Sequence, residues 1–249
     1  MTRSPLLAAL GIGRGDVVAL AGAGGKTTLA YRLAADARAA GLRVLVTTTT
    51  HMGELPEATT GRVFIEAEGD ARPALREALA CDGLATLLGR RVRPDKLEGV
   101  DPERVDALAG CADLILVEAD GARGRSLKTP AGHEPVVPRS STLLLVLAAL
   151  DVLGQPLGED HVHRLDLVAA AAGRAVGGRV DEDVVVAALG EASGYPSRAP
   201  ARARSAAFLN KAEDETALAA SARIARRLVP PYDFVATGSA REGWARALS

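Results

Sequence analysis

A glycine-rich segment near the start of this 249-residue chain carries residue types that bind phosphate. An apolar run over residues 17–21 leads directly into Gly22, Ala23, Gly24, Gly25, Lys26, Thr27 and Thr28. Glycines allow several backbone N–H groups to converge on one anion, and the positive end of a following helix dipole points at the same place. The segment therefore predicts a phosphate site, in which Lys26 contacts the β- and γ-phosphates of a nucleotide and the Thr27 hydroxyl binds Mg²⁺.

The spacing of this segment differs from the usual P-loop pattern at one position. That pattern has a glycine five residues before the glycine of Gly-Lys-Thr, and here Leu20 holds the place. Gly22 and Gly24 supply the backbone flexibility instead. The expected strand before the segment and helix after it favour a P-loop over the alternative, which is an ordinary strand-to-helix turn of small residues.

Two acids follow the apolar run at 114–117, where a buried strand would end. They are Glu118 and Asp120, and with the glycine after them they form a Glu-x-x-Gly pattern whose glycine amide would contact the γ-phosphate. Carboxylates at a strand end beside a P-loop are placed to organise Mg²⁺ and the attacking water. We therefore predict Lys26, Glu118 and Asp120 as catalytic residues. Either acid could bind the metal, and the sequence does not choose between them; acids that merely solvate a strand end are the alternative.

A third element follows the apolar run at 206–209 and consists of Asn210, Lys211 and Glu213. In GTP-binding P-loop proteins, Asn-Lys-x-Asp at this place recognises the guanine edge through its acid. Glu213 stands where Asp is usual, so the pattern suggests GTP and leaves ATP open. The three residues are predicted to bind the nucleotide, although Asn-Lys after a strand is also typical of a helix cap.

Two polar loops complete the set of candidate residues. Four threonines at 47–50 and His51 follow the second expected strand, where the hydroxyls would face the phosphates or simply end the strand. The loop after the acidic strand end is stiffened by prolines and carries Arg123, Lys128, His133 and Glu134. Such a loop would bind a second anionic substrate or a client protein, and a solvated basic loop is the alternative.

Five segments together resemble the YqeC family, namely 22–28, 47–52, 117–122, 127–138 and 162–164. Members of this family are described as accessory proteins of selenium-dependent hydroxylases. The resemblance implies a P-loop protein that binds GTP or ATP with Mg²⁺ and acts in the maturation of molybdenum hydroxylases. It also implies such a hydroxylase, or its cofactor, as the partner. His51 stands where the family usually has a lysine.

Strands and helices must alternate to position these residues. Apolar runs predict strands over 16–21, 43–47, 63–65, 114–117, 143–147, 206–209 and 234–236, and helices are expected over 27–40, 72–80, 164–172, 181–190 and 215–228. This order predicts an α/β fold with a mostly parallel sheet flanked by helices and with ligands at the carboxyl ends of the strands. Residues 1–249 are predicted to form a single P-loop NTPase-like domain, with an elaboration over about 53–110 and a mobile surface loop over 193–204.

Composition narrows the possible partners and the compartment. The formal net charge is −1, so we expect no long-range attraction to nucleic acid or to an anionic membrane. No stretch approaches the roughly 18 apolar residues of a membrane span. Cys81 and Cys111 have no cysteine or histidine at metal-ligand spacing, so we predict neither a zinc site nor a disulfide framework and expect a cytoplasmic protein.

Three functions fit these residues. The first is a Mg²⁺-dependent NTPase that acts as an accessory protein. The second is a small-molecule kinase or an ATP-dependent ligase, because Gly-x-x-Gly-Lys-Thr-Thr also resembles the nucleotide loop of the Mur-type ligases, although 249 residues are too few for their three domains. The third is a nucleotide-binding scaffold without catalysis.

Overall fold

A nine-stranded sheet forms the centre of the computed structural model, which describes residues 4–53, 57–68, 71–93 and 96–248. Neighbouring strands within it are parallel, except that β14, at one edge of the sheet, is antiparallel to β13. In spatial order the strands are β14 (Trp244–Ala247), β13 (Phe234–Ser239), β12 (Arg204–Asn210), β10 (Leu143–Ala149), β1 (Asp16–Gly22), β8 (Leu114–Glu118), β2 (Val44–Thr48), β5 (Leu84–Leu88) and β4 (Arg62–Ile65).

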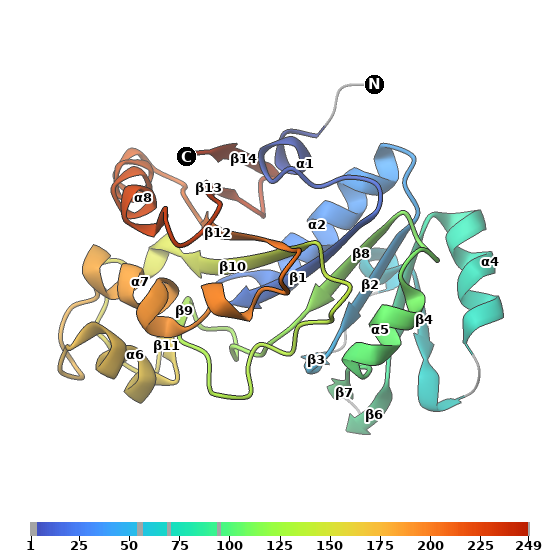
Figure 1. Ribbon diagram of the computed structural model, residues 1–249, viewed down its shortest axis with the longest axis horizontal. Helices are drawn as coiled ribbons and strands as arrows, with labels where there is room; N and C mark the ends of the chain where they lie inside the picture. Colours follow the sequence, from blue (N-terminus) through green and yellow to red (C-terminus); the bar gives the residue numbers. More distant parts are fainter. Residues whose placement is uncertain (1–3, 54–56, 69–70, 94–95, 249) are drawn as a thin grey trace.

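Helices cover both faces of this sheet (Figure 1). They are α1 (Pro5–Ala9), α2 (Lys26–Ala39), α3 (Glu57–Thr60), α4 (Arg72–Asp82), α5 (Pro102–Leu108), α6 (Leu165–Ala172), α7 (Glu182–Leu189) and α8 (Glu215–Leu228). Helices α1 and α2 pack on the face that carries Val18 and Leu20 of β1. Helices α7 and α8 pack on the face that carries Ala19 and Ala21, and α4 and α5 extend this second layer toward β5.

The continuously apolar strands explain why both faces are covered. Successive side chains of a strand point to opposite faces, and in β1 the side chains from Val17 to Ala21 are all buried. The predicted α/β fold, with a mostly parallel sheet flanked by helices, is confirmed. The seven predicted strands and five predicted helices are present, each within three residues of its predicted ends.

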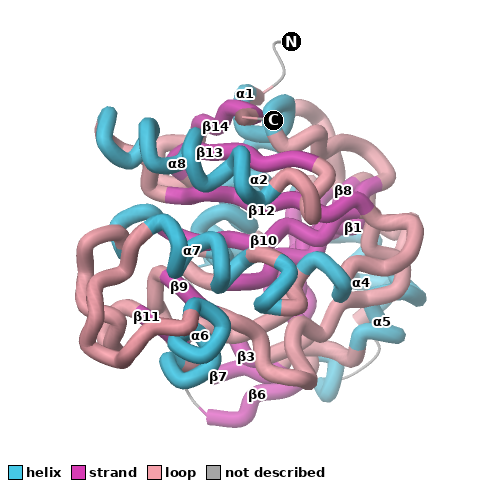
Figure 2. Tube along the Cα trace, turned by 60° about the vertical axis from the view of Figure 1, so that its left-hand side comes forward, coloured by secondary structure: helices cyan, strands magenta, loops and turns pink. Residues whose placement is uncertain are grey.

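The segment 53–110 contributes both to the main sheet and to a small one. Its strands β4 and β5 extend the main sheet at one edge. The small sheet contains β3 (His51–Gly53), β7 (Lys96–Glu98) and β6 (Arg90–Arg93), and a second, two-stranded sheet pairs β9 (Leu127–Lys128) with β11 (Val162–His163). Figures 1 and 2 both place β6 and β7 near the lower edge of the molecule, and β9 and β11 beside α6 and α7.

The segment 193–204 is not simply a surface loop, so that prediction is wrong in part. Two short 3₁₀ turns, Glu191–Ser193 and Pro196–Arg198, bracket Tyr195, which is fully buried. Its aromatic ring packs in the core with α7 and α8. The prolines and arginines around it keep the rest of the segment at the surface, which is why its composition resembles a solvated loop.

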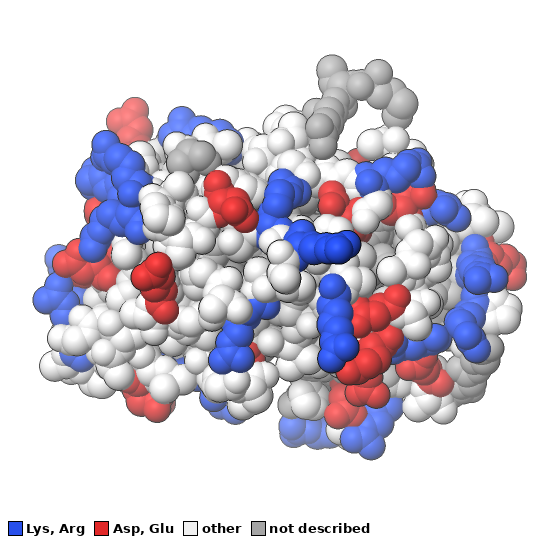
Figure 3. Space-filling model, in the orientation of Figure 1, with Lys and Arg blue, Asp and Glu red and all other residues white. Residues whose placement is uncertain are grey.

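Charges of both signs are interspersed on the face shown in Figure 3, in keeping with the formal net charge of −1. Within the described part of the chain, no helix has the length and apolar character needed to cross a membrane.

Candidate functional site

The glycine-rich segment forms a tight turn from the end of β1 to the start of α2. Gly22, Gly24 and Gly25 have φ values of +87°, +82° and +115°, a region that other residues rarely adopt. A Cβ on Gly22 would lie 2.2 Å from the Leu147 carbonyl oxygen, and one on Gly24 would lie 2.4 Å from the Ala149 Cβ. The loop therefore requires glycine at both positions, because β10 approaches the backbone too closely for a side chain.

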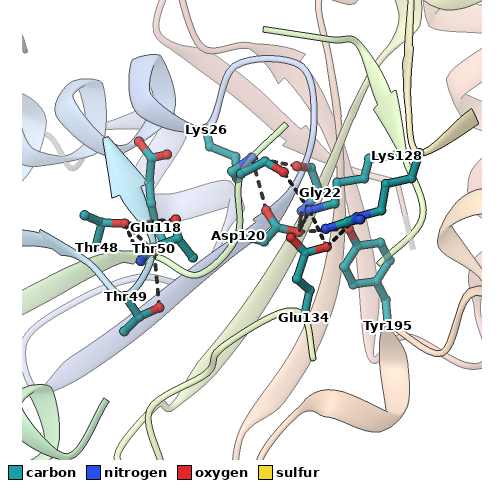
Figure 4. A network of polar contacts seen from close by, with 12 residues as sticks. Gly22, Lys26, Thr48, Thr49, Thr50, Glu118, Asp120, Lys128, Glu134 and Tyr195 are labelled. Carbon is teal, nitrogen blue, oxygen red and sulfur yellow. Dashed lines mark hydrogen bonds and ion pairs between the residues drawn. The ribbon is translucent and has the colours of Figure 1, made fainter. Parts of the chain in front are cut away.

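Lys26 starts α2, and its ammonium group bonds to protein oxygens inside the loop. Its Nζ donates a hydrogen bond to the Gly22 carbonyl at 2.6 Å and lies 3.1 Å from Asp120 Oδ1 in an ion pair. The side chain is only 6% exposed, yet it lines the pocket described below. Figure 4 shows this lysine turned toward Asp120.

Asp120 is fully buried and is surrounded by donors and cations. Its Oδ2 accepts hydrogen bonds from the Gly22 amide at 3.1 Å and the Tyr195 hydroxyl at 3.0 Å, and it lies 3.0 Å from Lys128 Nζ. Burying a carboxylate is costly unless opposite charges and hydrogen bonds compensate it, and here two lysines and two donors do so. Asp120 does not line the pocket.

The chain of charges continues from Lys128 to the start of α6. Lys128 is fully buried and contacts the Gly121 carbonyl at 2.6 Å and Glu134 Oε2 at 3.0 Å. The same carboxylate accepts hydrogen bonds from Arg164 Nε at 2.9 Å and from the Ala131 amide at 3.1 Å. Burial raises the pKa of Glu134, but Arg164 and Lys128 outweigh it and hold the pKa at about 2.

Glu118 ends β8 and faces the pocket from its buried position. Its Oε1 has no hydrogen-bond partner among the described residues. Burial raises the pKa of this carboxyl above its usual value, although Lys26 and the Thr27 hydroxyl act in the opposite direction. A buried carboxylate oxygen without a partner, next to a threonine hydroxyl, is the kind of oxygen donor that Mg²⁺ accepts.

The four threonines divide into two pairs. The Thr47 and Thr48 hydroxyls donate to the carbonyls of Leu87 at 2.7 Å and Glu118 at 2.9 Å, so they hold neighbouring strands together. Thr49 and Thr50 line the pocket, as do His51 and Met52 beyond them. The interpretation that the hydroxyls end the strand therefore applies to Thr47 and Thr48, and contact with phosphates stays a prediction for Thr49 and Thr50.

The Asn210 segment lies behind the glycine-rich loop. Asn210 Nδ2 donates to the Gly24 carbonyl at 2.7 Å, and its Oδ1 accepts from the Ala240 amide at 2.9 Å, so it bridges the loop and the end of β13. Lys211 forms an ion pair with Asp151 at 2.5 Å, and Glu213 is exposed. None of the residues from Asn210 to Glu213 lines the pocket.

The pocket has a volume of about 800 Å³ and is open at the carboxyl ends of β1, β2 and β8. Its lining includes the predicted site residues Gly24, Gly25, Lys26, Thr27, Thr28, Glu118, Arg123, His133 and Glu134. Asp120 and Lys128 lie behind this lining, and Gly22 and Ala23 form the base of the loop. Arg125, His163 and Arg164 also line the pocket; they lie in segments that the sequence singles out but were not predicted as site residues. Tyr195, which contacts Asp120 behind the lining, belongs to no motif of the sequence.

Comparisons with known proteins agree with the motifs. The family profile described as "YqeC protein" matches residues 18–166. The chain is 33% identical to "Uncharacterized protein YqeC" of Escherichia coli (strain K12) over 211 residues. The aligned residues cover 84% of this chain and 81% of that protein. A solved structure, FtsY from Mycoplasma mycoides, superposes with a TM-score of 0.41 at 13% identity over 94% of this chain; the chain spans 63% of FtsY. On the profile match and the identity to the Escherichia coli protein, the chain belongs to the YqeC family.

Proposed function

We propose that this protein binds GTP or ATP with Mg²⁺ at the glycine-rich loop and hydrolyses it. The observation that carries the proposal is the arrangement of three features at one pocket. They are the tight glycine turn, in which β10 lies too close for a side chain at Gly24, the lysine at the start of α2, and Glu118, whose buried Oε1 has no hydrogen-bond partner among the described residues. Converging amides and a helix start suit the terminal phosphates of a nucleotide. Lys26 would exchange its contact with Asp120 for the phosphates, while Lys128 continues to neutralise Asp120.

We assign different roles to the two acids. Glu118 and Thr27 would hold Mg²⁺, because both line the pocket and Glu118 Oε1 lacks a donor among the described residues. When bound, the metal offsets negative charge on the phosphates. Glu118 would also orient the attacking water. Asp120 would position Lys26, since its oxygens already face two lysines, Tyr195 and a loop amide.

Asn210, Lys211 and Glu213 would bind the base. Asn210 supports this role, because its bridge between Gly24 and Ala240 places the segment directly behind the phosphate loop. The maturation of a molybdenum hydroxylase, in the cytoplasm, is proposed as the process served, and the support for it is the family resemblance.

Nucleotide titration with product analysis tests the proposal. Calorimetric titration of GTP, ATP and CTP with Mg²⁺ is expected to give binding of GTP or ATP, with slow release of phosphate. Lys26→Ala should weaken that affinity at least about tenfold, whereas Arg202→Ala, an exposed change before β12, should leave it unaltered. An affinity that Lys26→Ala does not change, or the absence of nucleotide binding, would refute the proposal.

The same assay separates the two alternative functions. A scaffold would bind nucleotide without turnover. A kinase or ligase would place the phosphoryl group on a second molecule, so phosphate would appear on that molecule and not in solution.

A further inference from the structure

Part of the pocket lining carries three arginines, Arg123, Arg125 and Arg164, and two histidines, His133 and His163. We call this part the cationic wall because of its arginines. The wall adjoins the glycine-rich loop, because the Gly24 amide donates to the Arg125 carbonyl at 2.8 Å. It continues through β9 to β11, where Lys128 and His163 lie opposite each other in neighbouring strands. It ends at Arg164, the residue directly before α6. Segments from three separate parts of the sequence thus bring these side chains to one surface.

The cations of the wall exceed the acids available to neutralise them. Glu118 and Glu134 are the two acids in the lining, and Glu134 already contacts both Lys128 and Arg164. The side chains of Arg123 and Arg125 form no hydrogen bond or ion pair within the described part of the chain. Two arginine side chains, one exposed and one half-buried, therefore line the pocket without an acidic partner among the described residues.

The environment of His163 shows that the cations converge. Burial lowers the pKa of His163, and Lys128, Arg164 and Arg123 lower it further. Because burial and the nearby cations lower its pKa, His163 is neutral near pH 7. It can therefore form a hydrogen bond with a ligand without adding a positive charge next to Lys128, Arg164 and Arg123.

Backbone strain is concentrated at the same wall. Arg123 and Arg164 have φ values of +49° and +58°, and among the described residues only Lys211 is a further non-glycine residue with positive φ. Such a conformation costs roughly 1 kcal/mol or more. Strain of this kind is concentrated at ligand-binding sites, where the surrounding structure holds the side chains in position.

The pocket has room for more than the terminal phosphates of a nucleotide. Its volume of about 800 Å³ lies in the range of small-molecule sites, yet no residue of the Asn210–Glu213 segment lines it. The base predicted to contact that segment would therefore lie outside, and the space along the cationic wall would be left for another molecule.

We infer that the cationic wall binds a second substrate, a small molecule that carries a phosphate or another multiply charged oxyanion, beside the terminal phosphate of the nucleotide. The inference rests on the proposed function for its nucleotide. Guanidinium groups suit such anions because their planar N–H groups bind two oxygens at once. Several guanidinium groups together suit a ligand with more than one negative charge better than they suit a single carboxylate. Lys128 and Glu134 would support the wall from behind, since they hold Arg164 in place.

Pyrophosphate is the probe for a test on the full-length protein. Protein saturated with a fluorescent, non-hydrolysable nucleotide and Mg²⁺ is titrated with pyrophosphate, and both heat and nucleotide fluorescence are followed. We expect pyrophosphate to bind without displacing the nucleotide. The double change Arg123→Ala with Arg125→Ala should weaken its binding about tenfold or more while leaving the nucleotide affinity within about twofold.

Two controls separate this inference from the proposed function. Arg202→Ala, at the opposite end of the strands from the pocket, should change neither affinity. In the Lys26→Ala background, the double change Arg123→Ala with Arg125→Ala should still weaken pyrophosphate binding about tenfold or more, so the wall can be measured even if no nucleotide binds. Displacement of one nucleotide per pyrophosphate, a lack of pyrophosphate binding, or an affinity unaffected by the double change would overturn the inference.

Discussion

Lys26 and Lys128 share a single buried counterion. Their ammonium groups lie 3.1 Å and 3.0 Å from different oxygens of Asp120, and Figure 4 shows the carboxylate between them. One lysine belongs to the phosphate loop and the other to β9, which adjoins the cationic wall. The charge of Asp120 is therefore common to both parts of the pocket.

Asp120→Asn should destabilise the protein strongly, because it leaves two buried lysines with one fewer anion. Removing one member of a buried ion pair costs about 3–5 kcal/mol, and urea denaturation would measure the loss. Asp183 offers a matched control, since it also pairs with two cations, Arg174 and Arg227, but is 59% exposed. Asp183→Asn should cost at most about 1 kcal/mol. Equal losses for both variants would contradict this interpretation of Asp120.

Glu118→Gln should separate binding from hydrolysis. The amide keeps the size of the side chain but loses the charge that orients water, so phosphate release should fall by about 10²-fold or more. Because burial raises the pKa of Glu118, its charged form is unfavourable in the fold near pH 7, and the variant should be at least as stable as the wild type. Phosphate release and thermal unfolding measure the two effects, with Glu159→Gln, an exposed change, as the control. Unchanged turnover would remove Glu118 from the reaction.

Gly24→Ala should disrupt the phosphate loop. The added methyl group would meet Ala149 at 2.4 Å, and the φ of +82° disfavours any other residue. We expect a loss of about 2–4 kcal/mol in unfolding free energy, together with loss of nucleotide binding. Gly132→Ala is the control, because Gly132 is exposed and its Cβ would meet no atom within 4 Å; it should change stability by at most about 0.5 kcal/mol. A Gly24→Ala protein with the stability of the wild type would contradict the prediction, because it would mean that β10 can move to accommodate the methyl group.

Acid should weaken the fold partly through Glu134. Its pKa of about 2 lies below the ordinary value of 4.5, so the charged form stabilises the native state. This contribution is complete above about pH 4.5 and is lost as the pH falls toward 2. Glu134→Gln should therefore be less stable at pH 7 and should lose less on acidification. Asp113, whose pKa Arg43 also lowers to about 2, becomes protonated over the same pH range. The Glu134→Gln variant should therefore still lose some stability in acid.

Unfolding free energies at pH 7, 5, 4 and 3 check this expectation. Curves for the wild type and Glu134→Gln that stay parallel across that range would show that the contacts with Lys128 and Arg164 do not stabilise the charged carboxyl.

Local patterns predicted the main sheet and the strand–turn–helix conformation of the glycine-rich loop well. Long apolar strands such as β10 and β12 are recognisable because a strand buried on both faces needs apolar side chains at every position. The glycines before Lys26 are recognisable because the tight turn requires positive φ values there. The strand β5 was missed because its apolar run follows a helix with little break, where periodicity does not separate the two.

The inner part of the site was beyond such reasoning. Tyr195 meets Asp120 across 75 positions of sequence, from a segment whose neighbours are proline and arginine. Strands β9 and β11 have two residues each, too few for any periodic pattern, yet they place Lys128 behind the pocket lining and His163 in it. These contacts arise from tertiary packing, and sequence spacing contains no information on them.

Tyr195 also connects the core to the surface. Its hydroxyl donates to Asp120 while the short turns on either side of it lie at the exterior. A local opening of residues 191–198 would withdraw that donor and expose the buried Asp120 carboxylate to water. We expect such an opening to change the electrostatic potential at Lys26, because Asp120 forms an ion pair with it.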